Sequence, residues 1–250
     1  MNICVCGIGR AGQAMIHRLI KSEHKICGAL VKANNENIGA NLGDYLGVSA
    51  LNAHILSIND CVNELKKKNT DLIIDFSNQA ATKTLISISA EIGAKLVICT
   101  TNHSTETIDY LKEYTKEHSL GVVYAPNLTL GINLLIEIVS HLSLILPDFD
   151  FEIVERHCKS KPRGTMTANI ISNAIGRGDT HISSVRAGGY VGIHEVTCAN
   201  ENERITIVHE SFSRQAFAYG AMLAADFIKD KTGFFVMKDV INDIKERMLK

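Results

Sequence analysis

One stretch near the middle of the chain gathers the side chains best suited to proton transfer. Residues 155–165 are Glu-Arg-His-Cys-Lys-Ser-Lys-Pro-Arg-Gly-Thr. His157 and Lys161 lie at i and i+4, so they would share one face of a helix or converge on one ligand in a loop. Histidine titrates near neutral pH, and lysine gives up a proton when burial or other cations lower its pKa. The pair therefore suits protonation of a substrate that has received a hydride.

Gly164 and Thr165 follow this pair and precede a helical pattern at 166–175. If they open that helix, free backbone N–H groups and the Thr165 hydroxyl are available to a carboxylate. Lys159 and Arg163 add positive charge, so we predict a small anionic substrate that carries a carboxylate. A basic surface loop before a helix is the alternative, and the spacing alone does not choose between them. Nucleophilic catalysis by Cys158 would need a third group that the sequence does not display.

A second chemical centre is the glycine motif at the N-terminus. An apolar run at 2–6 predicts a strand, and apolar residues at helical spacing over 13–20 predict a helix. Between them Gly7 permits a tight turn, Gly9 lets a pyrophosphate approach the backbone, and Gly12 lets helix and strand pack closely. This context favours dinucleotide binding over a βα turn that binds nothing.

The end of the second predicted strand, 26–31, bears on the choice of cofactor. NAD-binding proteins carry an acidic residue there for the ribose 2′-hydroxyl, whereas this chain has Val31 and Lys32. Lys32, together with Arg10 of the glycine motif, suits a 2′-phosphate. We therefore predict NADPH as the cofactor, with NADH as the alternative if both cations are only solvated surface residues.

Strand and helix patterns alternate through the first half of the chain. Strands are expected at 71–76, 95–99 and 121–124, with helices at 80–92 and 108–118, whereas 37–58 shows only a weak pattern. This alternation predicts an α/β fold with a doubly wound, parallel, Rossmann-like sheet. Ligands of such sheets bind beyond the carboxyl ends of the strands. Three of these ends carry polar loops: Asp75-Phe76-Ser77, Thr100-Thr101-Asn102 and Ala125-Pro126-Asn127.

The second half has a different pattern. A long apolar helix is expected at 128–146, followed by an alternating strand at 149–155. After a helix at 168–175, strands are expected at 183–187, 192–199 and 204–209, and the chain closes with two helices from Phe217 onwards. We expect a second, α+β domain with an antiparallel or mixed sheet.

The composition is ordinary for a soluble globular protein. The 250 residues are 46% hydrophobic and 21% charged, with a net charge of −1, which favours neither nucleic acid nor an anionic membrane as a partner. The chain lacks an apolar run long enough for a transmembrane helix and a secretory signal, so we expect a cytoplasmic protein. The seven cysteines include no C-x-x-C pair, and we predict reduced thiols and no metal site.

Taken in order, these motifs resemble the 4-hydroxy-tetrahydrodipicolinate reductase (dihydrodipicolinate reductase) family of lysine and diaminopimelate biosynthesis. The resemblance covers nearly the whole chain. Besides the motifs above, it rests on Glu155-x-His157-x-x-x-Lys161, Arg186-Ala187-Gly188, Gly192-x-His194, His209 and Ser213-Arg214-x-x-Phe217-Ala218-x-Gly220-Ala221.

The resemblance implies an oxidoreductase that reduces a cyclic, unsaturated dicarboxylate with NADPH or NADH, as a homotetramer whose two domains close on each other. It implies a dinucleotide-binding domain at 1–127 and 214–250, and a substrate and oligomerisation domain at 128–213. His157 and Lys161 match the proton-donating pair, and Gly164 and Thr165 match part of the carboxylate-binding loop. The cofactor residues implied are Gly7, Gly9, Arg10, Gly12, Asp75, Phe76, Ser77, Thr100, Thr101, Pro126 and Asn127.

Several positions of this chain differ from the usual family pattern. Cys158 stands where a second histidine is usual, and the loop from Lys161 to Thr165 is three residues shorter, with Arg163 in place of a serine. Asn102 stands where the family usually has glycine. These differences leave two alternatives to the lysine-pathway reductase. One is a reductase of the same fold that acts on another imine or unsaturated carboxylate, and the other is a non-catalytic nucleotide-binding relative.

Overall fold

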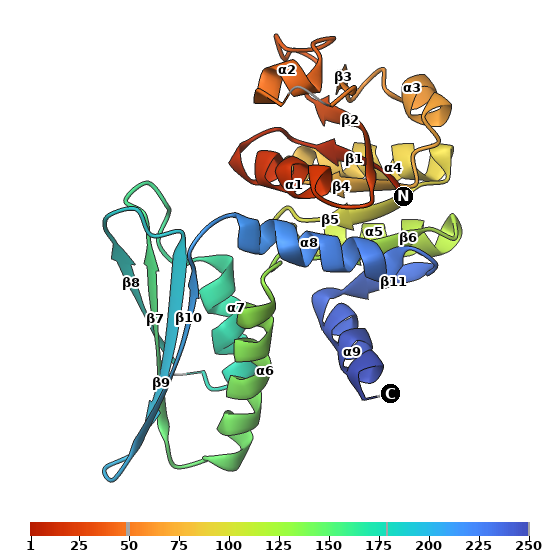
Figure 1. Ribbon diagram of the computed structural model, residues 1–250. Helices are drawn as coiled ribbons and strands as arrows, with labels where there is room; N and C mark the ends of the chain where they lie inside the picture. Colours follow the sequence, from red (N-terminus) through yellow and green to blue (C-terminus); the bar gives the residue numbers. More distant parts are fainter. Residues whose placement is uncertain (49–50, 179, 250) are drawn as a thin grey trace. The chain divides into compact units, whose positions relative to one another are not determined.

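The computed structural model describes residues 1–48, 51–178 and 180–249, which form two compact units. The first comprises Met1–Leu128 and the chain from Phe217 onwards, and the second is Thr129–Ala216. The first unit is built on a seven-stranded sheet and the second on a four-stranded sheet (Figure 1). In the described part of the chain, no helix has both the length and the apolar character needed to span a bilayer.

The sheet of the first unit has the strand order β11-β6-β5-β4-β1-β2-β3, and its strand pairs are parallel. The chain runs outwards from β1 in one direction through β2 and in the other through β4, which confirms the predicted doubly wound α/β fold. The strands are β1 (Asn2–Cys6), β2 (Lys25–Val31), β3 (His54–Ser57), β4 (Leu72–Asp75), β5 (Lys95–Ile98), β6 (Gly121–Tyr124) and β11 (Gly233–Val236).

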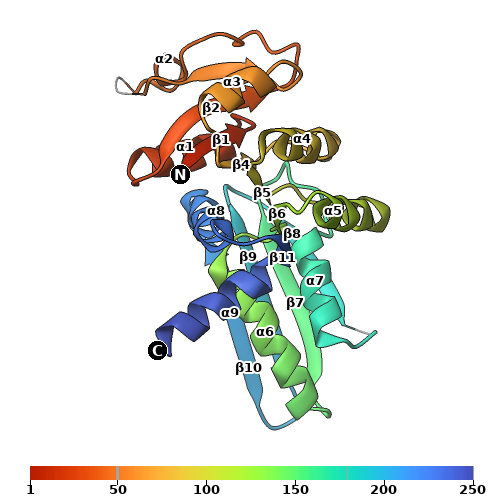
Figure 2. The same cartoon turned by 90° about the vertical axis from the view of Figure 1, so that its right-hand side faces the viewer.

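Helices cover both faces of this sheet (Figure 2). Successive residues of a strand point to opposite faces, so Ile3 and Val5 join one hydrophobic cluster while Cys4 and Cys6 join the other. The first cluster includes residues of α1 (Arg10–Ile20), α2 (Leu42–Leu46), α8 (Gln215–Ile228) and α9 (Met237–Met248). The second includes residues of α3 (Val62–Lys67), α4 (Gln79–Ile92) and α5 (Thr105–Glu117).

Two short strands and a short helix lie where the sequence predicted none. β3 and α2 fall within the weakly patterned segment 37–58, of which residues 49–50 lie outside the described part. β3 pairs with β2, and β11 pairs with β6 at the opposite edge of the sheet. Each strand has only four residues. Both are edge strands, and an edge strand is stabilised by its one neighbour in the sheet, which local periodicity does not reveal.

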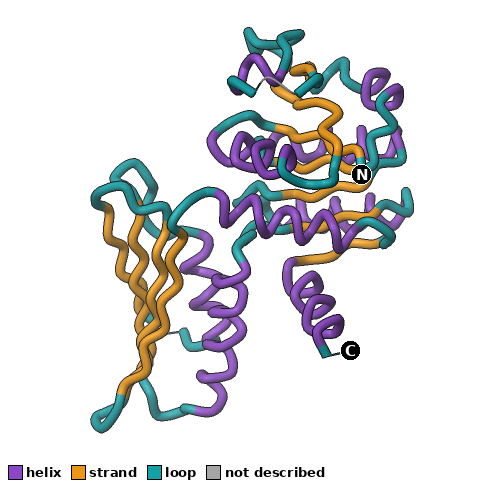
Figure 3. Tube along the Cα trace, viewed as in Figure 1, coloured by secondary structure: helices purple, strands orange, loops and turns teal. Residues whose placement is uncertain are grey.

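The second unit packs two helices on a mixed sheet, as expected for the predicted α+β domain (Figure 3). The sheet order is β10-β9-β7-β8, with β7 parallel to β8 and antiparallel to β9. Apolar residues of both helices, β7 and β9 form the core of this unit. Its elements are α6 (Leu130–Ile145), β7 (Asp150–His157), α7 (Met166–Ile175), β8 (His181–Arg186), β9 (Gly192–Ala199) and β10 (Arg204–Ser211).

Candidate active site

Strand β7 continues its core-facing row with two ionisable residues. Its side chains alternate in burial, and the buried positions are Phe151, Ile153, Glu155 and His157. The first two belong to the hydrophobic core, whereas Glu155 is 0% and His157 is 8% exposed at the end of the strand. The period-two pattern of the strand therefore carries a carboxylate and an imidazole into the interior.

The sheet register aligns further polar residues with these two. Glu155 is directly opposite Ser184 of β8 and His194 of β9, and His194 is opposite His209 of β10. These four residues form one row across the whole sheet. Arg186 of β8 is opposite His157, one step further along the same face. Residues from all four strands thus gather on the face that α6 and α7 cover.

The Glu155 carboxylate accepts hydrogen bonds from several residues of this cluster and of the loop that precedes α7. Its Oε1 accepts hydrogen bonds from Ser184 Oγ (2.6 Å), Arg186 Nη2 (2.5 Å) and Gly164 N (3.2 Å). Its Oε2 accepts from both the backbone N–H and the hydroxyl of Thr165. Burial raises the pKa of Glu155, but the hydrogen bonds from Ser184, Thr165 and Arg186 and the Arg186 charge outweigh it and lower the pKa to about 2. The carboxylate is therefore ionised at neutral pH.

The loop that contains Lys161 lies over this carboxylate. Gly164 has φ 66°, a left-handed conformation that glycine adopts without strain, and this turn directs its N–H towards Glu155. Thr165 is the N-cap of α7 and accepts a hydrogen bond from Ala168 N. Gly164 and Thr165 do form the start of a helix, as the sequence predicted. In this structure their donors hold a carboxylate of the chain itself.

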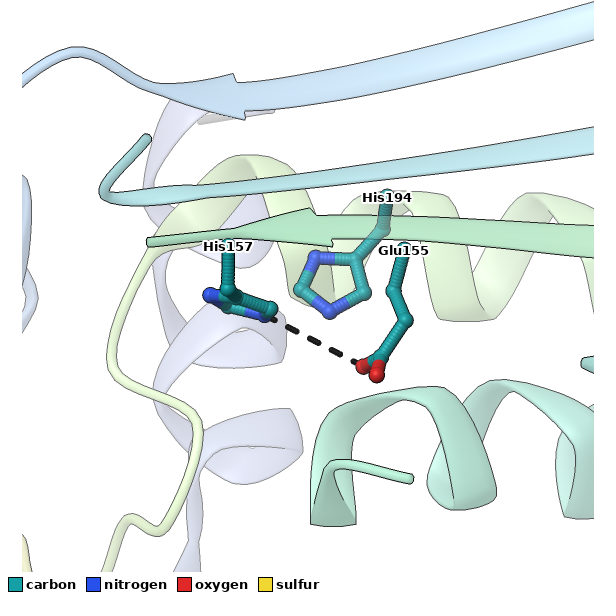
Figure 4. A group of neighbouring side chains, drawn as sticks. All are labelled: Glu155, His157 and His194. Carbon is teal, nitrogen blue, oxygen red and sulfur yellow. Dashed lines mark ion pairs between the residues drawn. The ribbon is translucent and has the colours of Figure 1, made fainter. Parts of the chain in front are cut away.

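The two ring nitrogens of His157 have different surroundings: one is hydrogen-bonded to the backbone and the other faces the Glu155 carboxylate. Its Nδ1 lies 3.1 Å from the carbonyl oxygen of Val191, and its Nε2 lies 3.9 Å from Glu155 Oε2 (Figure 4). Burial lowers the pKa of His157, the Val191 carbonyl and the Glu155 charge raise it, and the charges of Arg186 and Lys161 lower it. The net direction is downward. Lys161 is exposed in the loop, close enough for its charge to act on His157.

His194 completes the group on the side of β9. Its ring lies edge-on to that of His157, with centroids 5.4 Å apart, and its two nitrogens have no hydrogen-bond partner among the described residues. Burial lowers its pKa to about 4, so the ring is neutral at physiological pH.

One oxygen of Glu155 and one nitrogen each of His157 and His194 lie within 4.8 Å of one another, and these atom types are common metal ligands. Because the Arg186 guanidinium already neutralises this carboxylate, we interpret the cluster as two imidazole rings beside the Glu155–Arg186 ion pair.

The glycine motif lies at the carboxyl edge of the first unit's sheet. Gly7 has φ 88°, and a Cβ there would lie 2.7 Å from the Phe76 carbonyl oxygen. A Cβ on Gly12 would lie 1.8 Å from the carbonyl oxygen of Gly7. A Cβ on Gly9, in contrast, would meet no described atom of a non-adjacent residue within 4 Å. Gly9 is the N-cap of α1. An open glycine at a helix N-terminus fits the pyrophosphate of a dinucleotide.

The other predicted cofactor residues lie at the same edge. The strands β1, β4, β5 and β6 are consecutive neighbours in one parallel sheet, so the loops that follow them share one edge. Thr100 is buried and Thr101 exposed after β5, and Pro126 and Asn127 are half-buried after β6. Lys32 and Arg10, the predicted 2′-phosphate ligands, are exposed at the end of β2 and at the start of α1.

Asp75 is buried at the end of β4 and holds the loop that follows this strand. Its fully buried carboxylate accepts hydrogen bonds from the backbone and the hydroxyl of Ser77 at 2.8 Å and 2.5 Å, and from Thr82 Oγ1 at 3.1 Å. Burial raises the pKa of Asp75. These contacts fix the loop and leave Phe76 and Ser77 half-buried at the edge.

His103 was not identified from the sequence. It is 7% exposed, and its Nε2 lies 3.0 Å from Thr82 Oγ1 and 3.4 Å from Thr100 Oγ1. Through Thr82 it extends the network of Asp75. Its position directly after the polar loop at 100–102 was the one sequence signal for this residue. Its partner Thr82 could not be predicted, because Thr82 lies on α4, in another βα unit.

Two family models match the chain. The model described as dihydrodipicolinate reductase, N-terminus, covers residues 1–128, and the one described as dihydrodipicolinate reductase, C-terminus, covers residues 131–241. The chain belongs to the dihydrodipicolinate reductase family. The resemblance inferred from the motifs is thereby confirmed.

Curated relatives agree along nearly the whole length. The chain is 33% identical to the 4-hydroxy-tetrahydrodipicolinate reductase of Methanopyrus kandleri, with 93% of each chain covered. It is 33% identical to that of Methanosarcina barkeri and 32% identical to that of Ralstonia nicotianae, each with 96% of this chain and 99% of the relative covered.

Solved structures share the fold of both units. A dipicolinate-bound dihydrodipicolinate reductase from Paenisporosarcina sp. TG-14 has a TM-score of 0.77 at 18% identity and covers 94% of this chain, with 97% of that chain covered. An amine dehydrogenase from Mycobacterium smegmatis has a TM-score of 0.70 at 12% identity, with 95% of this chain and 94% of that chain covered. At these identities the likeness describes the fold alone.

Proposed function

We propose that the protein reduces 4-hydroxy-tetrahydrodipicolinate in lysine and diaminopimelate biosynthesis. The observation that carries this proposal is the match of both halves of the chain to one reductase family, whose curated members at about 33% identity bear that name. The cluster around Glu155 and His157 supports it, because it offers a buried imidazole and nearby cations to an anionic substrate.

Cofactor binding is assigned to the first unit. The open face of Gly9 at the N-terminus of α1 supports a pyrophosphate site, with Gly7 and Gly12 shaping the turn. The loops after β4, β5 and β6 would face the nicotinamide end. The exposed cations Lys32 and Arg10 favour NADPH over NADH, because an ammonium and a guanidinium suit a 2′-phosphate.

Proton donation is assigned to His157 and Lys161. A bound nicotinamide cofactor supplies the hydride, which leaves a negative centre on the substrate that takes up one proton. His157 Nε2 has no hydrogen-bond partner among the described residues, and it is the atom we assign to hold that proton. The ammonium of Lys161 would attract a substrate carboxylate and share in the transfer. Gly164 and Thr165 would contribute to carboxylate binding only in addition to their bonds to Glu155.

A coupled assay tests this function. Purified protein is mixed with NADPH and with hydroxy-tetrahydrodipicolinate generated enzymatically, and oxidation of the cofactor is followed by its absorbance. Rapid, substrate-dependent oxidation is expected. Tight NADPH binding without oxidation would contradict the assigned substrate.

A second candidate is reduction of another imine or unsaturated carboxylate. Arg163, in the shortened loop, donates a hydrogen bond to the Ser184 carbonyl, so the loop is held by a residue that the usual family pattern does not have. A panel of cyclic imines in the same assay would identify such a substrate. A chain without turnover on any of them would instead be a nucleotide-binding relative.

We infer that the protein is a cytoplasmic homotetramer that assembles through the second unit. The face of its sheet opposite α6 and α7 carries apolar side chains on neighbouring strands. Val185 of β8 and Val208 of β10 are 40% and 56% exposed there, beside the half-buried Val154 and Ile193. Exposed apolar side chains on a sheet face suit packing against a second copy of that face. Sedimentation of the purified protein tests this assembly.

A further inference from the structure

Glu155 is a charged residue inside a core, and this requires an explanation. Its carboxylate lies in the same core-facing row of β7 as Phe151 and Ile153 and has no exposed surface. Removing a charge from water is strongly unfavourable unless partners replace the water. Five donors do so, from Ser184, Arg186, Gly164 and the two groups of Thr165. The carboxylate therefore has a full set of partners in the folded chain.

These partners belong to separate segments. Ser184 and Arg186 are on β8, Gly164 ends the loop of Lys161, and Thr165 caps α7. Arg186 also donates to the carbonyl oxygens of Lys161 (2.8 Å) and Pro162 (2.5 Å). Through Glu155 and Arg186, the loop that carries Lys161 is tied to the two strands whose ends carry His157 and Arg186.

The hydrogen bond of His157 determines which of its nitrogens exchanges a proton. Nδ1 faces the Val191 carbonyl, which only accepts hydrogen bonds, so Nδ1 carries a hydrogen in both charge states of the ring. Nε2 is then the atom that gains and loses a proton. It faces Glu155 Oε2 at 3.9 Å, and both rings and the carboxylate point towards one another (Figure 4).

The charges that act on His157 lie on β7, on β8 and in the loop of Lys161. Arg186 of β8 and Lys161 of the loop disfavour the imidazolium, and His194 of β9 is neutral. Glu155 of β7 is the one carboxylate of the described residues within this cluster. It therefore supplies the attraction that opposes the two cations.

We propose that Glu155 is a positioning residue that holds the Lys161 loop in place and provides the counter-charge that favours the protonated form of His157 Nε2. This inference rests on the proposed function and extends it to a side chain that is fully buried. The proton passes from Nε2 to the carbon or nitrogen that bears the electron pair after hydride addition. The ring returns to its neutral form with the Nδ1–H unchanged.

The test is Glu155→Gln, which keeps the shape and removes the charge. Nitrogen NMR of the histidine-labelled protein, without substrate, follows the titration of His157, assigned with a His157→Gln variant. The titration midpoint is expected to fall by at least about 1 pH unit, which means about tenfold less protonated ring at a fixed pH above it. An unchanged midpoint would overturn the proposal.

Two further variants separate a charge effect from damage to the fold. Glu155→Asp keeps the charge, so its midpoint should stay close to the wild-type value, and a midpoint as low as in Glu155→Gln contradicts the proposal. Glu152→Gln removes an exposed carboxylate from the same strand and should change nothing. If Glu155→Gln does not fold, nitrogen NMR of the wild-type protein still tests the proposal. A neutral His157 that carries its hydrogen on Nε2 instead of Nδ1 would contradict it.

Kinetics distinguish this inference from the proposed function. In Glu155→Gln, the limb of the kcat profile that falls with rising pH should move to lower pH, together with the NMR midpoint. A purely structural role would lower kcat equally at all pH values. If the wild-type protein does not turn over the assigned substrate, the proposed function fails, while the NMR titration still tests the role of Glu155.

Discussion

Gly192 leaves the space that the ring of His157 occupies. The two residues lie side by side on β9 and β7, and a Cβ built on Gly192 would be 2.9 Å from Cε1 and 3.4 Å from Nδ1 of His157. The ring has no free space on this side, because its Nδ1 is also held by Val191. The absence of one side chain on β9 thus sets the position of the His157 ring on β7, the residue to which we assign proton donation.

Gly192→Ala should displace the His157 ring and lower kcat by about 10²-fold, the scale expected for a misplacement of about 1 Å. Steady-state kinetics with NADPH would measure it, and the affinity for NADPH should not change. Gly189→Ala is the matched control, because no described atom lies within 4 Å of a Cβ there. Equal kcat values in the two variants would contradict the packing argument.

Lys161→Ala should lower kcat by about 10²-fold or more, the range typical of a lost proton-transfer group. Lys161 is exposed and its side chain does not support the core, so stability should stay near that of the wild type. Cofactor fluorescence titration should give an unchanged Kd for NADPH. A parallel loss of NADPH affinity would contradict the role assigned to Lys161.

Lys32→Ala should weaken NADPH binding by about tenfold and leave NADH binding unchanged, since a charge-assisted hydrogen bond contributes about 1.5–3 kcal/mol. Calorimetric titration of both cofactors measures the ratio. Lys25, at the other end of β2, provides the control variant Lys25→Ala. If Lys32→Ala weakens both cofactors equally, Lys32 does not bind a 2′-phosphate.

Acid should destabilise the protein through Glu155. Its folded pKa of about 2 is below the ordinary value of 4.5, so its contribution to stability is present above pH 4.5 and is lost as the pH falls towards 2. Urea unfolding between pH 5 and pH 2 should show a smaller loss of stability for Glu155→Gln than for the wild type. Glu152→Gln should follow the wild type. Parallel curves for all three proteins would show that Glu155 does not titrate as described.

The alternating pattern of β7 already contained part of the site. Because side chains of a strand alternate, a strand that buries Phe151 and Ile153 must also direct Glu155 and His157 to the same face. The same reasoning applied to β9 would have selected His194. Sequence reasoning assigned a role to His157 from its neighbours in the chain and gave none to Glu155, His194 or Arg186, because their partnership depends on strand order.

The sequence determined most of the elements, the glycine turn before α1, the doubly wound sheet and the family. The elements and the turn depend on residues within about one turn or one strand, so periodicity records them, and the sheet and the family follow from the order of these motifs along the chain. The tertiary structure decided the partners of Gly164 and Thr165, whose N–H groups bind Glu155 instead of facing an open site. It also decided that Gly192 makes room for His157. Both depend on strand register, which brings together residues tens of positions apart and leaves no trace in local spacing.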